Sequence, residues 1–531
     1  MPNEGINILV GANSAGKSTV LDAIELVTKG SLNGTRASNA LAPDWFNAEN
    51  AERFFESLEE GAVPSIPEIM ITVTFSDDPA MASICGCNGP EGPSIDAPGL
   101  FMHISVPQEL LVEFLNESKS IALSPGSKSI PVEYYACEWK SFKDADRRLV
   151  RRPSCITCSR VDARPAPYTR AVDSYARDIV ESELTEGQLR EISRKIRKAC
   201  AQIDSDILSQ ISVEASEKSK SLGLQLDQSP RSDWRNNVTL AREGLPFSAL
   251  GSAEQIVTKC AISLEKSTNE SILLMEEPEC HLSHTSLQSL LGLIEESMAD
   301  GQQLFITTHS PFVLNRLGLN NMSIIAAGFS PQRIGSLSPD TVRYFKKLSG
   351  YDTLRIVLSE KTVLVEGPTD EMVFDWAFRK MRGCLPQEKG IDVIESGVRY
   401  KRALELAAAV DKSPVVALRD NDDKAEEHWV SAVEAFESDG RKLLVGHDDE
   451  GRTIEPQMVC ANSGALATLA KAVGVEISDS AGLESYLLNH KVEWSLNLLE
   501  ADEEETACLN APRYIVEAID FIDPVEPDVR E

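Results

Sequence analysis

A phosphate-binding loop near the start of the chain has the most specific spacing in the sequence. Residues 11–18 fit the pattern G-x-x-x-x-G-K-[ST] and lie between an apolar strand pattern, 6–10, and an apolar helical pattern, 20–27. Such a loop surrounds a β-phosphate with backbone N–H groups, while its lysine reaches the β- and γ-phosphates and its hydroxyl binds Mg²⁺. The predicted nucleotide-binding residues are Gly11, Asn13, Ser14, Gly16, Lys17, Ser18 and Thr19, with Ser18 on the metal.

Two later apolar runs end in polar residues that suit nucleotide hydrolysis. Glu276 and Glu277 follow the strand pattern 271–275, and we assign Glu276 to the nucleotide-bound Mg²⁺ and Glu277 to the attacking water. His309 follows the pattern 303–308 and is placed to contact a γ-phosphate. Alternatively, Glu276 and Glu277 are ordinary acidic residues in the loop after a strand, and His309 has a structural role.

A second group of acids follows two other predicted strands. Glu366 ends the apolar run 362–365 and Asp370 opens the next helix, while Asp420 and Asp422 follow the run 414–418. Parallel neighbouring strands would bring these acids to one edge, and Asp420 and Asp422 would share a side if the chain stays extended. Carboxylates of this kind hold one or two Mg²⁺ or Mn²⁺ ions, and paired ions suit phosphodiester cleavage. Each acid alone is equally well a solvated strand end.

The elements that must position these residues alternate between strand and helix patterns. This alternation predicts an α/β chain with two successive parallel sheets flanked by helices. We expect an ATPase unit at 1–345, which contains a loop-rich and helical insertion at about 77–235, and a second unit at 346–531. Residues 77–130 are expected to be loops around one or two helices, 175–220 a polar helical arm, and 330–360 a hinge region.

The first unit resembles the ATP-binding-cassette ATPases, in particular the SMC-like branch with EEPE at 276–279. The resemblance spans roughly residues 1–330. It also includes residues 250–255, a turn of small residues that opens a helix. It implies a head-to-head dimer in which Ser252 contacts ATP held by the other subunit's loop. Ala253 stands where the family usually has glycine, which predicts a weaker ATP sandwich. The chain also begins directly at the strand before the loop, which predicts a misplaced start or an incomplete adenine pocket.

The second unit, with E-G-x-T-D followed by D-x-D, resembles the Toprim domain of topoisomerases, primases and related nucleases. A Toprim domain after an SMC-like ATPase is the arrangement of the OLD (overcoming lysogenisation defect) family nucleases. This resemblance implies an additional metal-binding acid, Glu455, and a late catalytic lysine, Lys491, suited to stabilising charge on the scissile phosphate. It implies Glu366 and Asp420 as catalytic residues, and a Rossmann-like parallel sheet for 346–531.

Two basic clusters are candidates for DNA contact in a chain whose net charge is −31. One is Arg147, Arg148, Arg151 and Arg152, with Arg160 and Arg164 nearby; the other is Arg194, Lys195, Arg197 and Lys198. Each phosphate contact would add to salt-sensitive affinity, but a salt-bridged helix face is the plainer interpretation. No aromatic residues alternate with these cations along the sequence.

Eleven cysteines, an odd number in a long chain, do not suggest a disulfide framework. Cys85, Cys87, Cys155 and Cys158 are able in principle to hold Zn²⁺, with free thiols as the alternative. Hydrophobic residues make up 42% of the 531 residues and charged residues 25%, as in folded multidomain proteins, and no apolar run reaches the ~18 residues of a membrane span. We therefore expect a cytoplasmic protein with no membrane partner.

Together these features predict an ATP-regulated, metal-dependent DNA endonuclease that forms a homodimer or larger homo-oligomer. By analogy its role would be phage defence or DNA repair, with a helicase or another defence protein as partner. Two alternatives remain: a nucleotide-gated sensor or scaffold that cuts nothing, and a repair-type ATPase whose Toprim unit only binds. A topoisomerase is less consistent with the sequence, since no nucleophilic tyrosine domain is evident.

Overall fold

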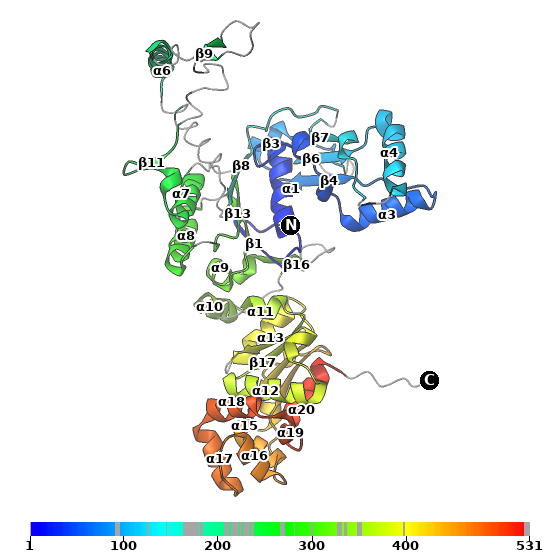
Figure 1. The fold of residues 1–531 in the computed structure, drawn as a ribbon, viewed down its shortest axis with the longest axis vertical. Helices are drawn as coiled ribbons and strands as arrows, with labels where there is room; N and C mark the ends of the chain where they lie inside the picture. Colours follow the sequence, from blue (N-terminus) through cyan, green and yellow to red (C-terminus); the bar gives the residue numbers. More distant parts are fainter. Residues whose placement is uncertain are drawn as a thin grey trace.

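The structure is a computed structural model of the whole chain (Figure 1). It describes residues 2–524 apart from 91–95, 125, 127, 145, 163–179, 181–183, 207–211, 214–221, 224–225, 227–233, 235–237, 266–270, 281, 299–300, 326–331, 334–336, 348–352 and 397–398. Among the described helices, none has both the length and the apolar character to cross a membrane.

A six-stranded sheet forms the centre of the first unit. Its order is β16 (Gln332–Arg333), β15 (Met322–Ile324), β1 (Ile6–Val10), β14 (Gln303–Thr307), β13 (Ser271–Glu276) and β8 (Thr157–Asp162). Every neighbouring pair is parallel except β15 with β16. The strands β1, β13 and β14 are largely apolar because helices cover both faces of the sheet.

The two faces of this sheet belong to different clusters of buried side chains. Ile8 and Ile306 face the helices α7 (Ser252–Glu265), α8 (His284–Ser297) and α9 (Pro311–Leu317). Leu9 and Leu274 face Leu21 of α1 (Lys17–Lys29) on the opposite side. The strand patterns at 6–10, 271–275 and 303–308 were therefore predicted correctly to within one residue.

An antiparallel sheet packs on the outer side of α1, which lies between the two sheets in Figure 1. It contains β4 (Ile69–Thr74), β6 (Ala97–Ser105), β7 (Ala136–Ser141) and the short β5 (Cys85–Gly86), with α3 (Ala48–Glu59) and α4 (Leu111–Leu123) alongside. The indole N–H of Trp139 donates to the carbonyl of Val27 at 2.8 Å and so joins this sheet to α1.

Two sequence expectations for the insertion differ from the structure. Residues 77–130 contain the long strand β6, whose apolar core was hidden by the Gly- and Pro-rich sequence before it. Within 77–235, β8 is a strand of the main sheet and not part of an insertion. The predicted polar arm at 175–220 contains one long helix, α6 (Glu186–Asp206), and one short strand, β9 (Ser212–Val213), which pairs with β10 (Leu222–Gly223) just beyond the arm. Much of the remainder of the arm lies outside the described residues.

A parallel four-stranded sheet forms the second unit, in the order β18 (Ile391–Glu395), β17 (Lys361–Val365), β19 (Val415–Arg419), β20 (Arg441–Val445). Helix α13 (Tyr400–Ala409) covers one face. The other face packs against α12 (Pro368–Arg382), α15 (Ile454–Ala461), α18 (Lys491–Glu500) and α20 (Arg513–Ile522), with α16 (Leu466–Ala472), α17 (Ser480–Asn489) and α19 (Glu503–Thr506) outside them.

The segment predicted as a hinge holds two helices, α10 (Pro339–Lys347) and α11 (Thr353–Leu358). Their buried side chains Phe345 and Ile356 belong to one cluster that continues from the six-stranded sheet to Leu364 and Ile394 of the four-stranded sheet. Glu405 of α13, which is buried, accepts hydrogen bonds from the Ser338 N–H and the Thr341 hydroxyl at 2.5 Å each, at the start of α10. The two sheets are therefore joined by packed helices.

Candidate nucleotide and metal sites

The loop 11–18 adopts the strained backbone that a phosphate cradle needs. Ser14 and Gly16 have φ angles of 62° and 96°, in the left-handed region. At Gly11 a Cβ atom would lie 2.3 Å from the carbonyl oxygen of Ile325, so only glycine fits beside β15. Helix α1 begins at Lys17, and its N-terminus faces the loop.

The functional side chains of this loop already have protein partners. The Lys17 ammonium donates to the carbonyls of Gly11 and Ala12 at 2.9 Å each, and burial lowers the pKa of Lys17. The Ser18 hydroxyl donates to Oε1 of Glu276 at 2.5 Å. Ser18 and Glu276, which were predicted to share one Mg²⁺, therefore lie side by side.

Arg160 is a member of this site that the sequence did not identify. Its guanidinium, on β8, donates to the second carboxylate oxygen of Glu276 at 2.8 Å, to Glu25 at 3.2 Å and to Asp22. The Arg160 side chain is only 8% exposed, so its predicted role in DNA contact is wrong, because it is buried among three carboxylates. Arg164 lies outside the described residues.

Replacing Arg160 with methionine is expected to lower the melting temperature by roughly 5–10 °C, since breaking a buried ion pair costs about 3–5 kcal/mol. Asp22, Glu25 and Glu276 would be left without their shared cation. Thermal unfolding of the nucleotide-free protein measures the effect. Arg148→Met is the matched control, because Arg148 is exposed and its partner is the single carboxylate of Glu138 among the described residues. Equal melting temperatures for the two variants would contradict the expectation.

Glu277 and His309 also lie together, at the ends of β13 and β14. Their side chains are 3.8 Å apart, and Glu277 has a φ of 42°, a left-handed conformation that is uncommon for non-glycine residues. Glu279 orders the same corner, because its carboxylate accepts from the Thr308 hydroxyl at 2.8 Å and the His309 N–H at 2.7 Å. Ser252 is exposed at the start of α7, and no described contact joins it to the loop 11–18 of the same chain.

Four of the predicted metal ligands converge at the carboxyl edge of the four-stranded sheet. Glu366 follows β17, Asp420 follows β19, Asp370 lies in the first turn of α12, and Glu455 lies in the first turn of α15. Burial, reinforced by the neighbouring carboxylates Asp370 and Glu366, raises the pKa of Asp420 to about 9. Burial and Glu366 likewise raise the pKa of Asp370 to about 7. These carboxylates thus repel one another within a buried volume.

Asp422 does not share the orientation of Asp420, contrary to the expectation from an extended chain. The strand ends at Arg419, and Asp422 adopts a left-handed φ of 50°, which turns the chain away. Its side chain is half exposed and pairs with Arg419 at 2.9 Å. Asp422 therefore lies at the rim of the acid cluster.

Lys491 begins α18, and its ammonium lies 3.3 Å from Oε1 of Glu455, so the two residues predicted from the family resemblance are neighbours. Oδ1 of Asp420 and Oε1 of Glu455 are buried and accept no hydrogen bond within the described residues. Among the described residues, no three or more His, Cys, Asp or Glu side chains are close enough together to coordinate a metal ion without rearrangement. The donor set nevertheless fits a hard divalent cation, since it offers buried carboxylate oxygens without donors.

Comparisons with known families agree with the two predicted domain types. Residues 357–422 match the family described as "Overcoming lysogenization defect protein-like, TOPRIM domain". Residues 138–315 match the AAA_21 family, an AAA domain linked by its description to the AbiEii toxin of the Type IV TA system. The chain joins an ATPase domain to an OLD-like Toprim domain. The domain pair predicted from the motifs is thereby confirmed.

Solved structures with detectable similarity include three relevant chains. The C-terminal region of the Xanthomonas campestris pv. campestris OLD protein is 18% identical, covering 31% of this chain and 92% of that chain with a TM-score of 0.22. The SmcHead bound to the C-winged helix domain of ScpA is 13% identical, covering 64% and 92% with a TM-score of 0.29. Stu0660 of Streptococcus thermophilus is 12% identical, covering 60% and 84% with a TM-score of 0.24. No curated protein matches the chain.

Two residues of the Toprim domain were missed as members of its site. Arg419 directly precedes Asp420 and contacts both Glu366 and Asp422. Tyr514 of α20 is fully buried, its hydroxyl has no hydrogen-bond partner among the described residues, and burial together with the acid cluster raises its pKa well above the usual value. Arg419 could have been found from its position directly before the D-x-D motif. Tyr514 lies on a separate helix far along the chain and belongs to no motif near the acids.

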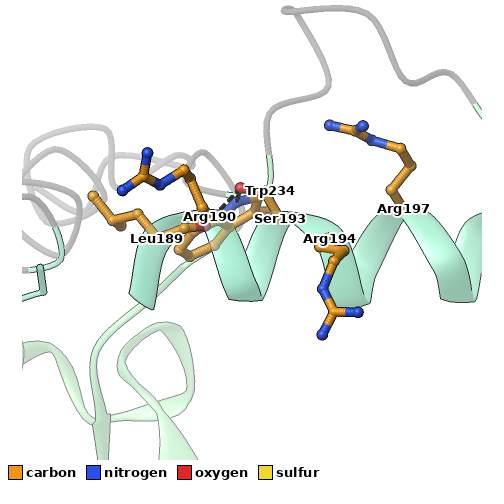
Figure 2. Close-up of a pocket in the computed structure, with 6 residues that line it drawn as sticks. All are labelled: Leu189, Arg190, Ser193, Arg194, Arg197 and Trp234. Atoms are coloured by element: carbon orange, nitrogen blue, oxygen red, sulfur yellow. Dashed lines mark hydrogen bonds between the residues drawn. The ribbon is translucent and has the colours of Figure 1, made fainter. Parts of the chain in front are cut away.

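An aromatic residue packs against the basic helix α6, although none alternates with its basic residues along the sequence. Arg194, Lys195, Arg197 and Lys198 are exposed as expected. Trp234 packs against the same helix, and its indole N–H donates to the Ser193 hydroxyl at 2.9 Å (Figure 2). An aromatic ring therefore does lie among these arginines, although Arg194 and Arg197 point to opposite sides of the helix in Figure 2.

The four cysteines considered for zinc do not gather among the described residues. Cys158 is buried in the core beneath α1, whereas Cys87 is exposed. The Cys85 thiol contacts Asp96, and the Cys155 thiol contacts Ser83. Their surroundings are those of separate free thiols.

Proposed function

We propose that this protein is an ATP-binding, divalent-metal-dependent DNA endonuclease whose Toprim domain nicks or cleaves the substrate. The observation that carries the proposal is the convergence of Glu366, Asp370, Asp420 and Glu455 at one sheet edge, where three buried carboxylate oxygens accept no hydrogen bond from the described residues. A scaffold that only binds a partner has no need of such a costly cluster of like charges.

Within this proposal the acids hold Mg²⁺ or Mn²⁺, which when bound supplies a Lewis acid for phosphodiester hydrolysis. Asp370, Asp420 and Glu455 offer the buried oxygens, and Glu366 lies beside them. Lys491, half exposed and 3.3 Å from Glu455, is placed to stabilise charge on the scissile phosphate.

The ATPase domain would regulate this chemistry. Lys17, Ser18 and Glu276 hold ATP and its Mg²⁺, and Glu277 with His309 lies where the attacking water would be. Ser252, which is exposed at the start of α7, would complete the site of a second subunit in a homodimer or larger oligomer. Phage defence or DNA repair, with a helicase or other defence protein as partner, is the corresponding cellular role.

Cleavage of supercoiled plasmid with Mg²⁺ or Mn²⁺, with and without ATP, tests the proposal. Nicking is expected for the native protein and for Asp423→Ala, because the Asp423 side chain is 74% exposed beside the cluster. Nicking is expected to vanish in Asp420→Ala. Absence of nicking by the native protein under all conditions, with ATP still bound, would favour the nucleotide-gated sensor instead.

Removing the Lys491 ammonium should slow nicking by roughly 10–100-fold even when the metal site is saturated, since the lysine would act on the scissile phosphate and not as a metal ligand. Nicking rates of Lys491→Ala at saturating Mn²⁺ provide the measurement. Lys471→Ala is the control, because Lys471 is exposed and pairs with the exposed Glu505. A native rate for Lys491→Ala would remove this residue from the mechanism.

A further inference from the structure

Tyr514 lies in the first turn of α20 and is fully buried, yet its hydroxyl has no hydrogen-bond partner among the described residues. The ring packs in the apolar cluster that contains Val365 of β17 and Leu418 of β19. A buried polar group without a partner destabilises a folded protein, so its presence calls for a reason. The ring would pack in this cluster equally well without the oxygen atom, so packing does not supply that reason.

The contacts of α20 fix which edge of the sheet Tyr514 faces. At the start of the helix, Arg513 donates to Asp449, in the loop after β20, at 2.6 Å. At the end of the helix, Asp523 accepts from Lys361, the first residue of β17, at 3.2 Å. Helix α20 therefore runs antiparallel to the strands, and its first turn lies at the carboxyl edge of the sheet, where the acids converge.

Asp420 is the acid that faces Tyr514. Leu418, two residues before Asp420, belongs to the same buried cluster as Tyr514, whereas Ala417 belongs to the cluster on the face covered by α13. Asp420 directly follows the strand and continues this alternation toward α20. Burial raises the pKa of Tyr514 well above its usual value, and among the acids the carboxylate of Asp420 adds most to this effect. The hydroxyl therefore keeps its proton and is available as a donor.

Asp420 also carries an acceptor without a partner. Its Oδ1 atom is buried and has neither a hydrogen bond nor an ion pair within the described part of the chain. The other buried oxygens of the cluster that accept no hydrogen bond do have cations beside them. Oε1 of Glu366 pairs with Arg419 at 3.0 Å. Oε1 of Glu455 pairs with Lys491 at 3.3 Å. An unpaired donor on α20 and an unpaired acceptor after β19 thus lie at one edge and on one face of the sheet.

We propose that Tyr514 is a positioning residue of the Toprim metal site, whose hydroxyl donates to Oδ1 of Asp420, directly or through one buried water, when a divalent cation is bound. This inference rests on the proposed metal-dependent function. Carboxylates that ligate metals are commonly oriented by a hydrogen bond from another group, and loss of that donor weakens metal binding by roughly 10–100-fold. Because Tyr514 is fully buried, it would act through Asp420 and not on the substrate.

Removing the hydroxyl alone tests the inference. Tyr514→Phe deletes one oxygen atom and keeps the ring in its apolar cluster. Mn²⁺ binding to the full-length, nucleotide-free protein is measured by electron paramagnetic resonance of free Mn²⁺, and the Toprim site is identified by its loss in Asp420→Ala. Melting curves in EDTA report the stability of the metal-free protein. Tyr486→Phe is the matched control, because it makes the same change in the same domain, on α17, where the ring stacks on His490.

Tyr514→Phe is expected to bind Mn²⁺ at the Toprim site roughly tenfold more weakly than the native protein. In EDTA it should melt at or above the native temperature, because an unpaired buried hydroxyl is gone. Plasmid nicking by this variant should fall at limiting Mn²⁺ and return to the native rate when Mn²⁺ is saturating. Tyr486→Phe should keep both the native Mn²⁺ affinity and the native nicking rate.

The outcomes separate this inference from the proposed function. Native Mn²⁺ affinity in Tyr514→Phe would overturn the role of Tyr514 while leaving metal-dependent cleavage intact. A metal-free Tyr514→Phe protein that melts below the native one, or does not fold, would overturn it as well, because the hydroxyl would then have a structural role. Weaker Mn²⁺ binding in Tyr514→Phe, without any plasmid nicking by the native protein, would instead overturn the nuclease proposal and leave the role of Tyr514 standing.

Discussion

Replacing Asp420 with asparagine is expected to abolish metal-dependent nicking, by at least about 100-fold, and to make the metal-free protein more stable. The amide removes one ligand, so the chemistry is lost. It also removes a carboxyl group whose ionised form is disfavoured by burial and by the neighbours Asp370 and Glu366, so that folding at pH 8 no longer requires this group to take up a proton. We expect a gain of roughly 1–3 kcal/mol, or about 3–8 °C in melting temperature, in EDTA at pH 8.

The stability of the metal-free protein should decrease as pH rises, because of Asp420. Because the pKa of Asp420 is raised to about 9 in the folded protein, the folded state binds more protons than the unfolded state between about pH 4 and pH 9. The contribution of Asp420 to the free energy of unfolding of the metal-free protein therefore falls as pH rises through that window. In Asp420→Asn, the free energy of unfolding should depend less steeply on pH. Addition of Mn²⁺ should stabilise the native protein more than the variant.

Asp423→Asn is the control for both effects, because Asp423 is exposed and has the same charge and nearly the same place in the chain. It should nick normally and keep the native melting temperature. A metal-free Asp420→Asn protein that melts below the native one would show that Asp420 makes a stabilising contact, and the repulsion argument would be wrong.

Lys17→Ala is expected to weaken ATP binding roughly 100-fold while plasmid nicking without ATP persists. The ammonium lies in the loop at 2.9 Å from two carbonyls, where it would exchange them for phosphate oxygens, and charge-assisted hydrogen bonds of this kind contribute about 1.5–3 kcal/mol. The two sites use separate residues, so basal cleavage should survive and only its response to ATP should disappear. Fluorescent nucleotide titration and the plasmid assay give the two readings.

Lys29→Ala, at the other end of α1, is the matched control, because Lys29 pairs with Glu25 and lies outside the loop. It should bind ATP normally. Loss of all nicking in Lys17→Ala, with a native melting curve, would contradict the separation of the two sites and show that nucleotide is obligatory for cleavage.

The sequence was most informative where chemistry requires adjacent residues. The loop 11–18, the acids 276–277 and the strand ends at Glu366 and Asp420 could be identified because each motif is short and its strand is strongly apolar. Glu455 and Lys491 were reached only through the family resemblance, yet they are neighbours at 3.3 Å. Their proximity depends on how α15 and α18 pack, which no local pattern encodes.

The failures have physical reasons of the same kind. Arg160 looked like surface charge because its three acidic partners lie on other elements of the fold. Asp422 was placed by strand alternation, but β19 ends three residues earlier and the backbone turns at a left-handed residue. The strand β6 was missed since glycine and proline before it suggested loops.

The apolar cluster that runs from Ile306 through Phe345 and Ile356 to Ile394 has a consequence for how the chain is divided experimentally. A cut between residues 345 and 346 would lie within the last turn of α10 and would expose apolar side chains of this cluster on both fragments. It would also separate Ser338 and Thr341 from their partner Glu405. The two halves should therefore be insoluble when expressed separately and soluble when co-expressed. In the intact protein, this continuous packing would allow a shift of the ATPase elements on nucleotide binding to move the elements that carry the acid cluster.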